Sequence, residues 1–410
     1  MAVAEMRDPN RPRALDLFSG TGVVGGHLSR TMPVTGVDVQ EYARVLTSAQ
    51  LLPARLDVPG MIASAESACA NSDHDPIGAI VARESAALDP HSPNLESIAS
   101  LIEGGSLVGQ ALGSAAHPFG VLASDALNWS LHGTSSTIFR YYGGVYFSYA
   151  QAIALDALAA ECDKLPAGSR DVGLACVLAV ASELVTSVGS HFAQPPNVRS
   201  REGDLKAQAL LRVIRKRRQD PFAAFARWAR RYEHLPQRAE GCFAVRSDVD
   251  DYLSSLSSDV GCAYADPPYT REHYSRFYHV LETIASRVVE PGIAHTTRGT
   301  GVDLSKGLYP LERYQSEFSI MSAAPAALTR LCDQLSQEEV PLVLSYSPVP
   351  HTNKPRQRVM SVETIMDLLA SAYKDVRVVE VAEVRHSRLN SAALNSSRIE
   401  GIEEVLFLAS

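Results

Sequence analysis

Val260-Gly-Cys-Ala-Tyr-Ala-Asp-Pro-Pro-Tyr269 is the stretch around which the rest of the chain is organised. Its first six residues are apolar or β-prone, which predicts a short buried strand. Asp266 then places a carboxylate at the carboxyl end of that strand. The two prolines that follow have no backbone N–H, so the chain leaves the sheet stiffly and its carbonyl oxygens can accept hydrogen bonds. Tyr269 ends the turn with a flat aromatic ring, and the stretch therefore predicts a rigid pocket.

This pocket would suit a planar ring that carries an exocyclic amine. The amine could donate to Asp266 and to the carbonyl oxygen of Pro267, while the ring stacks on Tyr269. The residues that would line this pocket, Asp266 to Tyr269, offer no thiol, no nucleophilic serine or threonine hydroxyl and no pair of metal ligands. A plain strand-ending turn is the competing interpretation, because Asp and Pro are common in turns.

A second motif lies near the N-terminus. Residues 13–18 predict a buried strand that runs into a glycine-rich turn, in which Gly20, Gly22 and Gly25 match G-x-G-x-x-G. Such glycines allow a tight turn and let a ligand approach the backbone. Residues 33–38 predict a second strand that ends in Asp38, where an acid can accept the ribose hydroxyls of an adenosine. This pattern alone also fits a nicotinamide-dependent dehydrogenase.

Asp16 distinguishes between a site for a nicotinamide dinucleotide and a site for S-adenosylmethionine. It lies inside the first predicted strand, just before the glycine-rich turn. A carboxylate there would repel a dinucleotide's pyrophosphate, which is bound by N–H groups and a helix dipole. The same carboxylate would attract the ammonium group of S-adenosylmethionine, so the residue favours that cofactor.

The two motifs together resemble those of adenine-N6 DNA methyltransferases. Asp16-Leu-Phe-Ser-Gly-Thr-Gly22 is similar to their cofactor motif D-x-F-x-G-x-G, and Asp266-Pro-Pro-Tyr269 looks like their catalytic tetrapeptide. The resemblance covers about half of the chain. It implies catalytic roles for Asp266, Pro267, Pro268 and Tyr269, and cofactor-binding roles for Asp16, Phe18, Ser19, Gly20, Gly22, Asp38 and Asp248. Asp248 ends a predicted strand at 241–248; Asp250 is its rival, and a simple helix cap is the alternative role.

Composition sets limits on this interpretation. The chain has 410 residues, 46% of them hydrophobic, and a net charge of −8, which argues against a surface that coats nucleic acid throughout. None of the six cysteines forms a C-x-x-C pair, so we expect neither zinc nor disulfides. No signal peptide precedes the first strand, and no apolar run is long enough to span a bilayer. These features favour a cytoplasmic protein without a metal site or membrane contact.

Residues 60–240 lack a clear strand–helix alternation and read mainly as helices, such as 151–162. They contain a run rich in arginine in an otherwise acidic chain. Such a run usually forms a solvated helix face. The functional interpretation is that its arginines contact the phosphates of a DNA duplex. The candidate DNA-binding residues, which include one after the tetrapeptide and one in the polar connection 385–398, are Arg199, Arg201, Arg215, Arg217, Arg218, Arg271 and Arg388.

The predicted fold is therefore α/β: a Rossmann-like methyltransferase sheet built from residues 1–59 and 241–410, with a large, mainly helical insertion for target recognition at 60–240. The predicted function is methyl transfer from S-adenosylmethionine to adenine N6 at specific sites in double-stranded DNA. The resemblance places it in restriction-modification or host defence, with a cognate restriction endonuclease or another defence-system subunit as a candidate partner. A cytosine-N4 or RNA methyltransferase is the alternative on the same fold, and a DNA-binding protein without activity is a third.

Overall fold

The computed structural model describes residues 2–70, 76–112, 119, 121–127, 136–272, 274–298, 301–348, 358–381 and 404–410. The chain divides into two compact units. The sheet unit comprises Met1–Ala54, His234–Tyr274 and Tyr314–Ser410, and the helical unit comprises Arg55–Glu233 and Ser275–Arg313.

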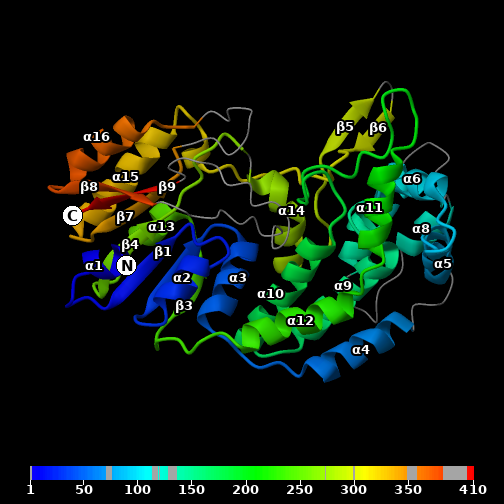
Figure 1. The fold of residues 1–410 in the computed structure, drawn as a ribbon, viewed down its shortest axis with the longest axis horizontal. Coiled ribbons are helices and arrows are strands. Elements are labelled where there is room, and N and C mark those ends of the chain that lie inside the picture. Colours follow the sequence, from blue (N-terminus) through cyan, green and yellow to red (C-terminus); the bar gives the residue numbers. More distant parts are fainter. Residues whose placement is uncertain are drawn as a thin grey trace. The chain divides into compact units, whose positions relative to one another are not determined.

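The sheet unit is built on a seven-stranded sheet with the order β3-β2-β1-β4-β7-β9-β8. Within this sheet, β9 runs antiparallel to both of its neighbours, β7 and β8, and the pairings that link β3, β2, β1, β4 and β7 are parallel. Figure 1 shows β1 and β4, which are far apart in the sequence, side by side in this sheet. The strands are β1 Arg13–Leu17, β2 Val34–Asp38, β3 Phe243–Arg246, β4 Val260–Ala265, β7 Leu342–Tyr346, β8 Val376–Val381 and β9 Glu404–Ala409.

Helices cover both faces of this sheet, because successive residues of a strand point to opposite sides. In β1, Leu15 and Leu17 join one buried cluster and Ala14 joins the other. The first cluster includes residues of α13, α15 and α16, and the second includes residues of α1, α2 and α3. These helices and one 3-10 turn are α1 Ala2–Met6, α2 Val23–Leu28, α3 Glu41–Leu51, α13 Val249–Leu253, η2 Glu317–Ser319, α15 Ala324–Gln337 and α16 Val362–Ala372.

The predicted α/β fold is thus confirmed as a mostly parallel mixed sheet, compatible with a Rossmann-like fold. The predicted strands at 13–18, 33–38 and 260–265 agree with β1, β2 and β4 to within a residue at each end. These strands were predictable because each is an apolar run that stops at a polar residue or a turn. All five of the buried cysteines, at 162, 176, 242, 262 and 332, are thiols that pack in apolar surroundings.

The regular structure in the described part of the helical unit is mainly α-helical, with one antiparallel pair, β5 His295–Arg298 and β6 Gly301–Leu304. Residues 275–313 pack with this unit, although the sequence analysis assigned them to the sheet domain. Backbone N of Phe192 donates to the carbonyl of Phe277 at 3.1 Å, and the hydroxyl of Tyr146 donates to the carbonyl of Gly307 at 3.0 Å. Buried aromatic side chains therefore tie this returning segment to the insertion.

The remaining helices of this unit are α4 Val58–Ala70, α5 Ile77–Ala87, α6 Leu95–Glu103, α7 Leu107–Leu112, α8 Val121–Leu127, the π-helical turn η1 Ile138–Tyr142, α9 Tyr149–Asp163, α10 Ala167–Leu184, α11 Ala207–Arg217, α12 Pro221–Glu233 and α14 Tyr274–Ala285. Within the described ranges, none of the helices has both the length and the apolar character needed to cross a bilayer.

Candidate active site

The carboxyl ends of β1, β2 and β4 meet at one edge of the sheet. The register pairs Leu17 with Val37 on one side and with Ala265 on the other. Continuing by one residue brings Asp38 and Asp266 to the two sides of Phe18. The strand order reverses here, since β2 lies on one side of β1 and β4 on the other, and such a switch point is where open α/β sheets bind ligands. The expected proximity of the segments around residues 16 and 266 is confirmed.

The glycine-rich turn has a strained, left-handed backbone at this edge. Phe18, Gly20 and Gly22 have φ angles of 58°, 53° and 71°. A Cβ on Gly22 would lie 2.5 Å from the Cα of Thr47, so only glycine fits there. A Cβ on Gly20 would meet its nearest protein atom only at 3.8 Å, so the backbone of Gly20 is open on that side. For a bulky residue such as Phe18, positive φ marks strain of the kind that accumulates at functional sites.

Two side chains fix the conformation of this turn. Asp38 accepts hydrogen bonds from the backbone N–H groups of Gly20 and Gln40, both at 3.0 Å. Ser19 Oγ accepts a hydrogen bond at 2.9 Å from Thr47 Oγ1. The carboxylate predicted to bind ribose therefore organises the loop.

Asp16 is 2% exposed and points toward the start of α2. Its Oδ2 accepts a hydrogen bond of 2.7 Å from the backbone N–H of Gly25. A Cβ on Gly25 would lie 2.8 Å from that oxygen, which explains glycine at this position. The pKa of Asp16 is raised to about 8, mainly by burial and in smaller part by the charges of Asp266 and Asp38, against the opposing effect of the Gly25 hydrogen bond. A buried carboxyl with this pKa would be stabilised as an anion by a bound cation.

Asp248 lies beside this edge at the N-cap of α13. Its Oδ1 accepts from the N–H of Asp250 at 3.0 Å, and its Oδ2 accepts from the hydroxyl of Tyr314 at 3.3 Å. Asp250, the rival candidate, forms an ion pair of 2.9 Å with Arg330. The helix-cap role of Asp248 is thus observed, and its contact with an adenine amine stays a prediction.

Asp266 follows directly after β4, and its side chain is exposed to solvent. Desolvation by the surrounding protein raises the pKa of this carboxyl to about 7, and the negative charge of Glu404 contributes in the same direction. Pro267 is buried, and Pro268 and Tyr269 are half-buried.

The ring of Tyr269 is held between two side chains. Tyr346 meets it edge-on, with ring centroids 5.6 Å apart. The guanidinium of Arg358 lies over its face, 4.8 Å from the ring centroid, and Arg358 also donates to Ser347 Oγ at 3.1 Å. One face of the proposed stacking surface is therefore covered by a cation, and a base would have to use the other face or displace Arg358.

Sequence reasoning missed three residues at this edge, namely Tyr264, Ser345 and Glu404. Ser345 Oγ donates a hydrogen bond to the carboxylate of Glu404, and Tyr264 interacts with Ser345 as well. Glu404 reaches the edge because β9 is antiparallel, so its first residue lies where the parallel strands end. The pairing partner of an isolated C-terminal strand has no local sequence signal, which explains why Glu404 was not predicted.

The predicted DNA-binding residues of the helical unit differ widely in their surroundings. The prediction that Arg217 binds DNA is wrong. Its side chain is 0% exposed and forms a 2.8 Å ion pair with Glu84, which is also buried. It donates further to the carbonyl oxygens of Gly144 and Val145, so it holds α11 to the loop before α9 and cannot contact DNA. Arg199 is partly buried between the carboxylates of Glu96 and Glu103.

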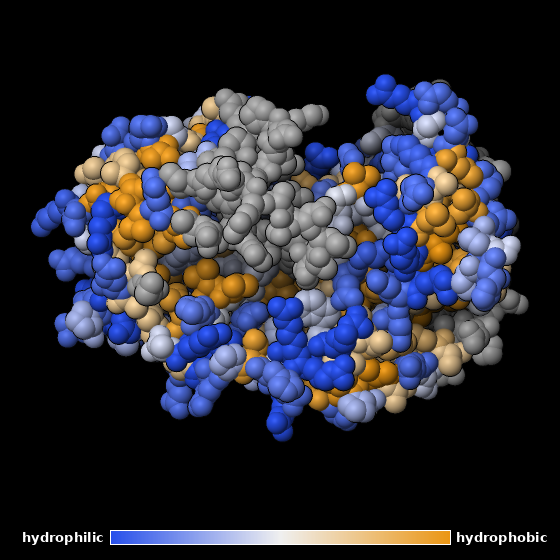
Figure 2. All heavy atoms as spheres, in the orientation of Figure 1, coloured by the Kyte–Doolittle hydropathy of each residue, from blue (hydrophilic) through white to orange (hydrophobic). Residues whose placement is uncertain are grey.

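The other predicted cations lie at the surface. Arg201, Arg215 and Arg218 are exposed in the helical unit, and Arg271 is exposed in the sheet unit. Figure 2 shows hydrophilic side chains gathered over α11 and α12. Arg388 lies outside the described residues.

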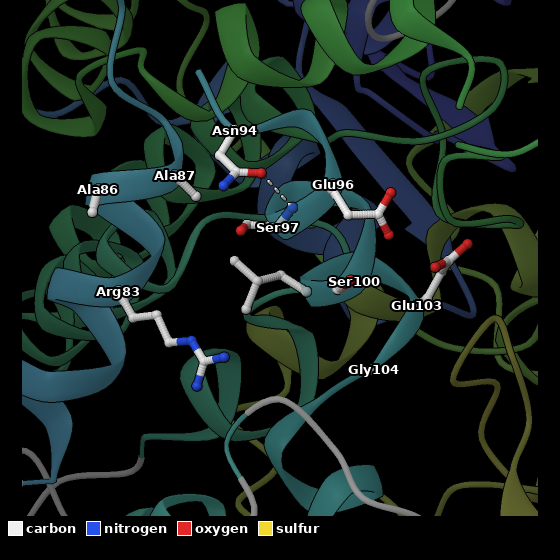
Figure 3. A pocket seen from close by; sticks show the side chains of 10 residues that line it. Arg83, Ala86, Ala87, Asn94, Glu96, Ser97, Ser100, Glu103 and Gly104 are labelled. Atoms are coloured by element: carbon white, nitrogen blue, oxygen red, sulfur yellow. Dashed lines mark hydrogen bonds between the residues drawn. The ribbon is translucent and has the colours of Figure 1, made fainter. Parts of the chain in front are cut away.

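A groove of about 830 Å³ lies between α5 and α6 of the helical unit (Figure 3). Arg83 and the carboxylates of Glu96 and Glu103 are among its lining residues, and Asn94 at its end caps α6 by accepting from the N–H of Ser97. Both glutamates are already paired with Arg199. The groove contains none of the residues that either sequence motif singled out.

The comparisons with known proteins give no family: no protein-family model matches the chain, and no curated protein matches it. The candidate site therefore depends on the two motifs and on the geometry that brings them together.

Proposed function

We propose that this protein is an S-adenosylmethionine-dependent DNA methyltransferase that modifies adenine N6. The observation that carries the proposal is the position of Asp266 beside the Asp16 to Gly22 loop at the switch point of the sheet. The two motifs are more than half the chain apart in sequence, but they lie at the ends of adjacent strands. A methyl donor held by one motif could therefore reach an acceptor amine held by the other.

The residues present fit the proposed cofactor. Gly20 leaves its backbone open to a ligand, while the buried carboxyl of Asp16 lies within the electrostatic influence of Asp38 and Asp266. Three carboxyl groups in one place favour a ligand that carries positive charge. In this assignment Asp16 faces the amino-acid ammonium group and Asp38 faces the ribose hydroxyls.

When bound, S-adenosylmethionine would supply an electrophilic methyl group. The chain's contribution is to orient the acceptor. Asp266 and the carbonyl of Pro267 would accept hydrogen bonds from the adenine amine, which draws its lone pair out of the ring. Tyr269, with its ring orientation fixed by Tyr346, would stack on the base. Correct placement of the reacting groups supplies much of the rate in such a reaction.

The base must leave the duplex to reach this site, which costs a few kcal/mol. The exposed arginines of the helical unit would contact DNA phosphates and position the duplex. Replacing Arg215 and Arg218 by Gln should lower the slope of log affinity against log salt by about 2. Arg227→Gln is the matched control, because Arg227 is already paired with Glu183 at 2.7 Å. An unchanged slope in the double variant would make this surface a solvated helix face only.

Methylation of DNA by the purified protein, with isotopically labelled S-adenosylmethionine and identification of the modified base, tests the proposal. Asp266→Ala should abolish methylation and retain cofactor binding by calorimetry. Activity retained in that variant would refute the role of Asp266. Labelled N4-methylcytosine, or labelled RNA in a parallel assay, would instead support the alternative functions, and tight binding of a nicotinamide dinucleotide would support the dehydrogenase.

A further inference from the structure

The carboxyl edge of the sheet carries a further carboxylate, Glu404, which belongs to neither sequence motif. β9 pairs with β7 so that Val405 faces Tyr346 and Leu406 faces Ser345. Glu404, the first residue of β9, therefore lies just beyond Tyr346 at this edge. β7 in turn pairs with β4, with Leu344 opposite Ala265, so Ser345 is level with Asp266. Three neighbouring strands thus bring Asp266, Ser345 and Glu404 to one line.

A hydrogen-bonded chain orients Glu404 within this line. Ser345 is 1% exposed, and its single hydroxyl proton is donated to Glu404. Tyr264 also hydrogen-bonds with Ser345, so the serine hydroxyl connects β4 with Glu404. Glu404 is half-buried, so its carboxylate is fixed by this chain and is not a freely rotating surface group.

Four described groups interact electrostatically with Asp266: Asp16 from β1, Tyr264 from β4, Tyr269 from the tetrapeptide and Glu404 from β9. Both tyrosines have pKa values raised above 10 by burial, so they are neutral at pH 7. The pKa of Asp16 is about 8, so it is mostly protonated at that pH. Glu404 is therefore the negative charge that acts on Asp266 near neutrality.

We infer that Glu404 is a positioning residue that makes Asp266 a proton acceptor at neutral pH. The inference rests on the proposed function for its chemistry. As the amine nitrogen forms its bond to the methyl carbon, the carbon–sulfur bond breaks and its electron pair stays on sulfur. The nitrogen then loses one proton: the N–H electron pair returns to nitrogen, and the proton goes to the carboxylate of Asp266. A neighbouring negative charge strengthens the attraction of Asp266 for this proton, and a base is most effective when it titrates near the working pH.

The test compares wild type with Glu404→Gln in the full-length protein. Gln keeps an oxygen that accepts from Ser345 and removes the charge. Carbon-13 NMR of labelled aspartate, assigned with Asp266→Asn, gives the titration midpoint of Asp266 without cofactor or DNA. We expect the midpoint to fall by about one unit in Glu404→Gln. It should remain near the wild-type value in Glu404→Asp, which keeps the charge.

The same variants give a kinetic readout. In Glu404→Gln, the acidic limb of the pH–rate profile for methylation should move to lower pH by the shift seen in the titration. A midpoint of Asp266 that does not move in Glu404→Gln overturns the inference, whether or not the protein methylates DNA. If the midpoint moves in Glu404→Gln but the wild-type protein has no methyltransferase activity, the coupling between Glu404 and Asp266 is supported and only the proposed function is refuted. If Glu404→Gln does not fold, Ser345→Ala takes its place, because it releases the carboxylate of Glu404 from the hydrogen bond that orients it. The midpoint should then fall by part of that unit, and an unchanged midpoint would overturn the inference.

Discussion

Binding of S-adenosylmethionine should release a proton from Asp16, and the structure allows the amount to be worked out. The carboxyl is buried and has a pKa of about 8. At pH 7 it is therefore about 90% protonated. A ligand ammonium group beside it would favour the anion and lower its pKa. The ligand's own amino group has an ordinary pKa near 8 and is already mostly protonated at pH 7, so it takes up little. Asp16 should then release about 0.9 proton for each ligand bound.

Asp16→Asn is the matched perturbation. The amide oxygen can still accept from the N–H of Gly25, so the start of α2 is preserved, and only the titrating charge is lost. Binding to wild type should tighten about tenfold from pH 6 to pH 7, because a proton must be displaced, and should weaken again above pH 8, where the ligand's ammonium group loses its own proton. Binding to Asp16→Asn should be weaker at pH 8, and its dependence on pH should be shallower by the contribution of this one proton.

Calorimetry in buffers with different enthalpies of ionisation measures the proton release directly. The difference between wild type and Asp16→Asn isolates the contribution of Asp16 from that of Asp266, whose pKa of about 7 lets it titrate in the same range. Equal proton release in the two proteins, or an affinity for wild type that does not change between pH 6 and 8, would refute the proposed contact between Asp16 and the ligand's ammonium group.

Three further outcomes follow from specific contacts. Arg217→Ala should destabilise the protein by about 3–5 kcal/mol in urea unfolding, since it leaves the buried Glu84 unpaired, whereas the exposed Arg215→Ala should change stability by less than about 0.5 kcal/mol; similar losses would contradict this. Gly36→Ala should cost about 1–3 kcal/mol, because the new Cβ would lie 2.4 Å from Thr47 Cγ2, and Thr47→Ser, which lacks that methyl group, should restore most of it; no rescue would place the strain elsewhere. Tyr269→Ala should slow single-turnover methylation about 5- to 150-fold and Tyr269→Trp far less, and equal losses would argue against stacking.

The strand part of the fold was readable from the sequence because its signals are local. β1, β2 and β4 are apolar runs, and two of them end at or beside an aspartate that reaches the carboxyl edge. Their adjacency follows from general rules for parallel sheets, so the central geometry of the candidate site was predictable. The position of β9 was not, because strand pairing at the C-terminal end depends on partners distant in sequence.

The burial of Arg217 could have been predicted from the sequence. In α11, Leu210, Val213 and Ile214 are buried, and Arg217 continues that stripe at the same helical spacing. The surrounding charges concealed this periodicity, since the run was interpreted by composition and not by face. Residues 275–313 illustrate the opposite case. Their membership of the helical unit depends on contacts such as that of Phe277 with Phe192, which no local pattern announces.

The concentration of carboxyl groups at one edge of the sheet opposes folding and thereby favours a cationic ligand. Because the pKa values of Asp16 and Asp266 are raised in the fold, these two carboxyl groups contribute most to the stability of the folded state below pH 4. That contribution is lost as pH rises through about 7 and about 8, when both must ionise in the fold. A cation bound between them would offset the repulsion. An edge that is destabilised by its own ionised carboxyl groups and relieved by positive charge is therefore a physical argument for a cationic ligand, and it is independent of the resemblance of either motif.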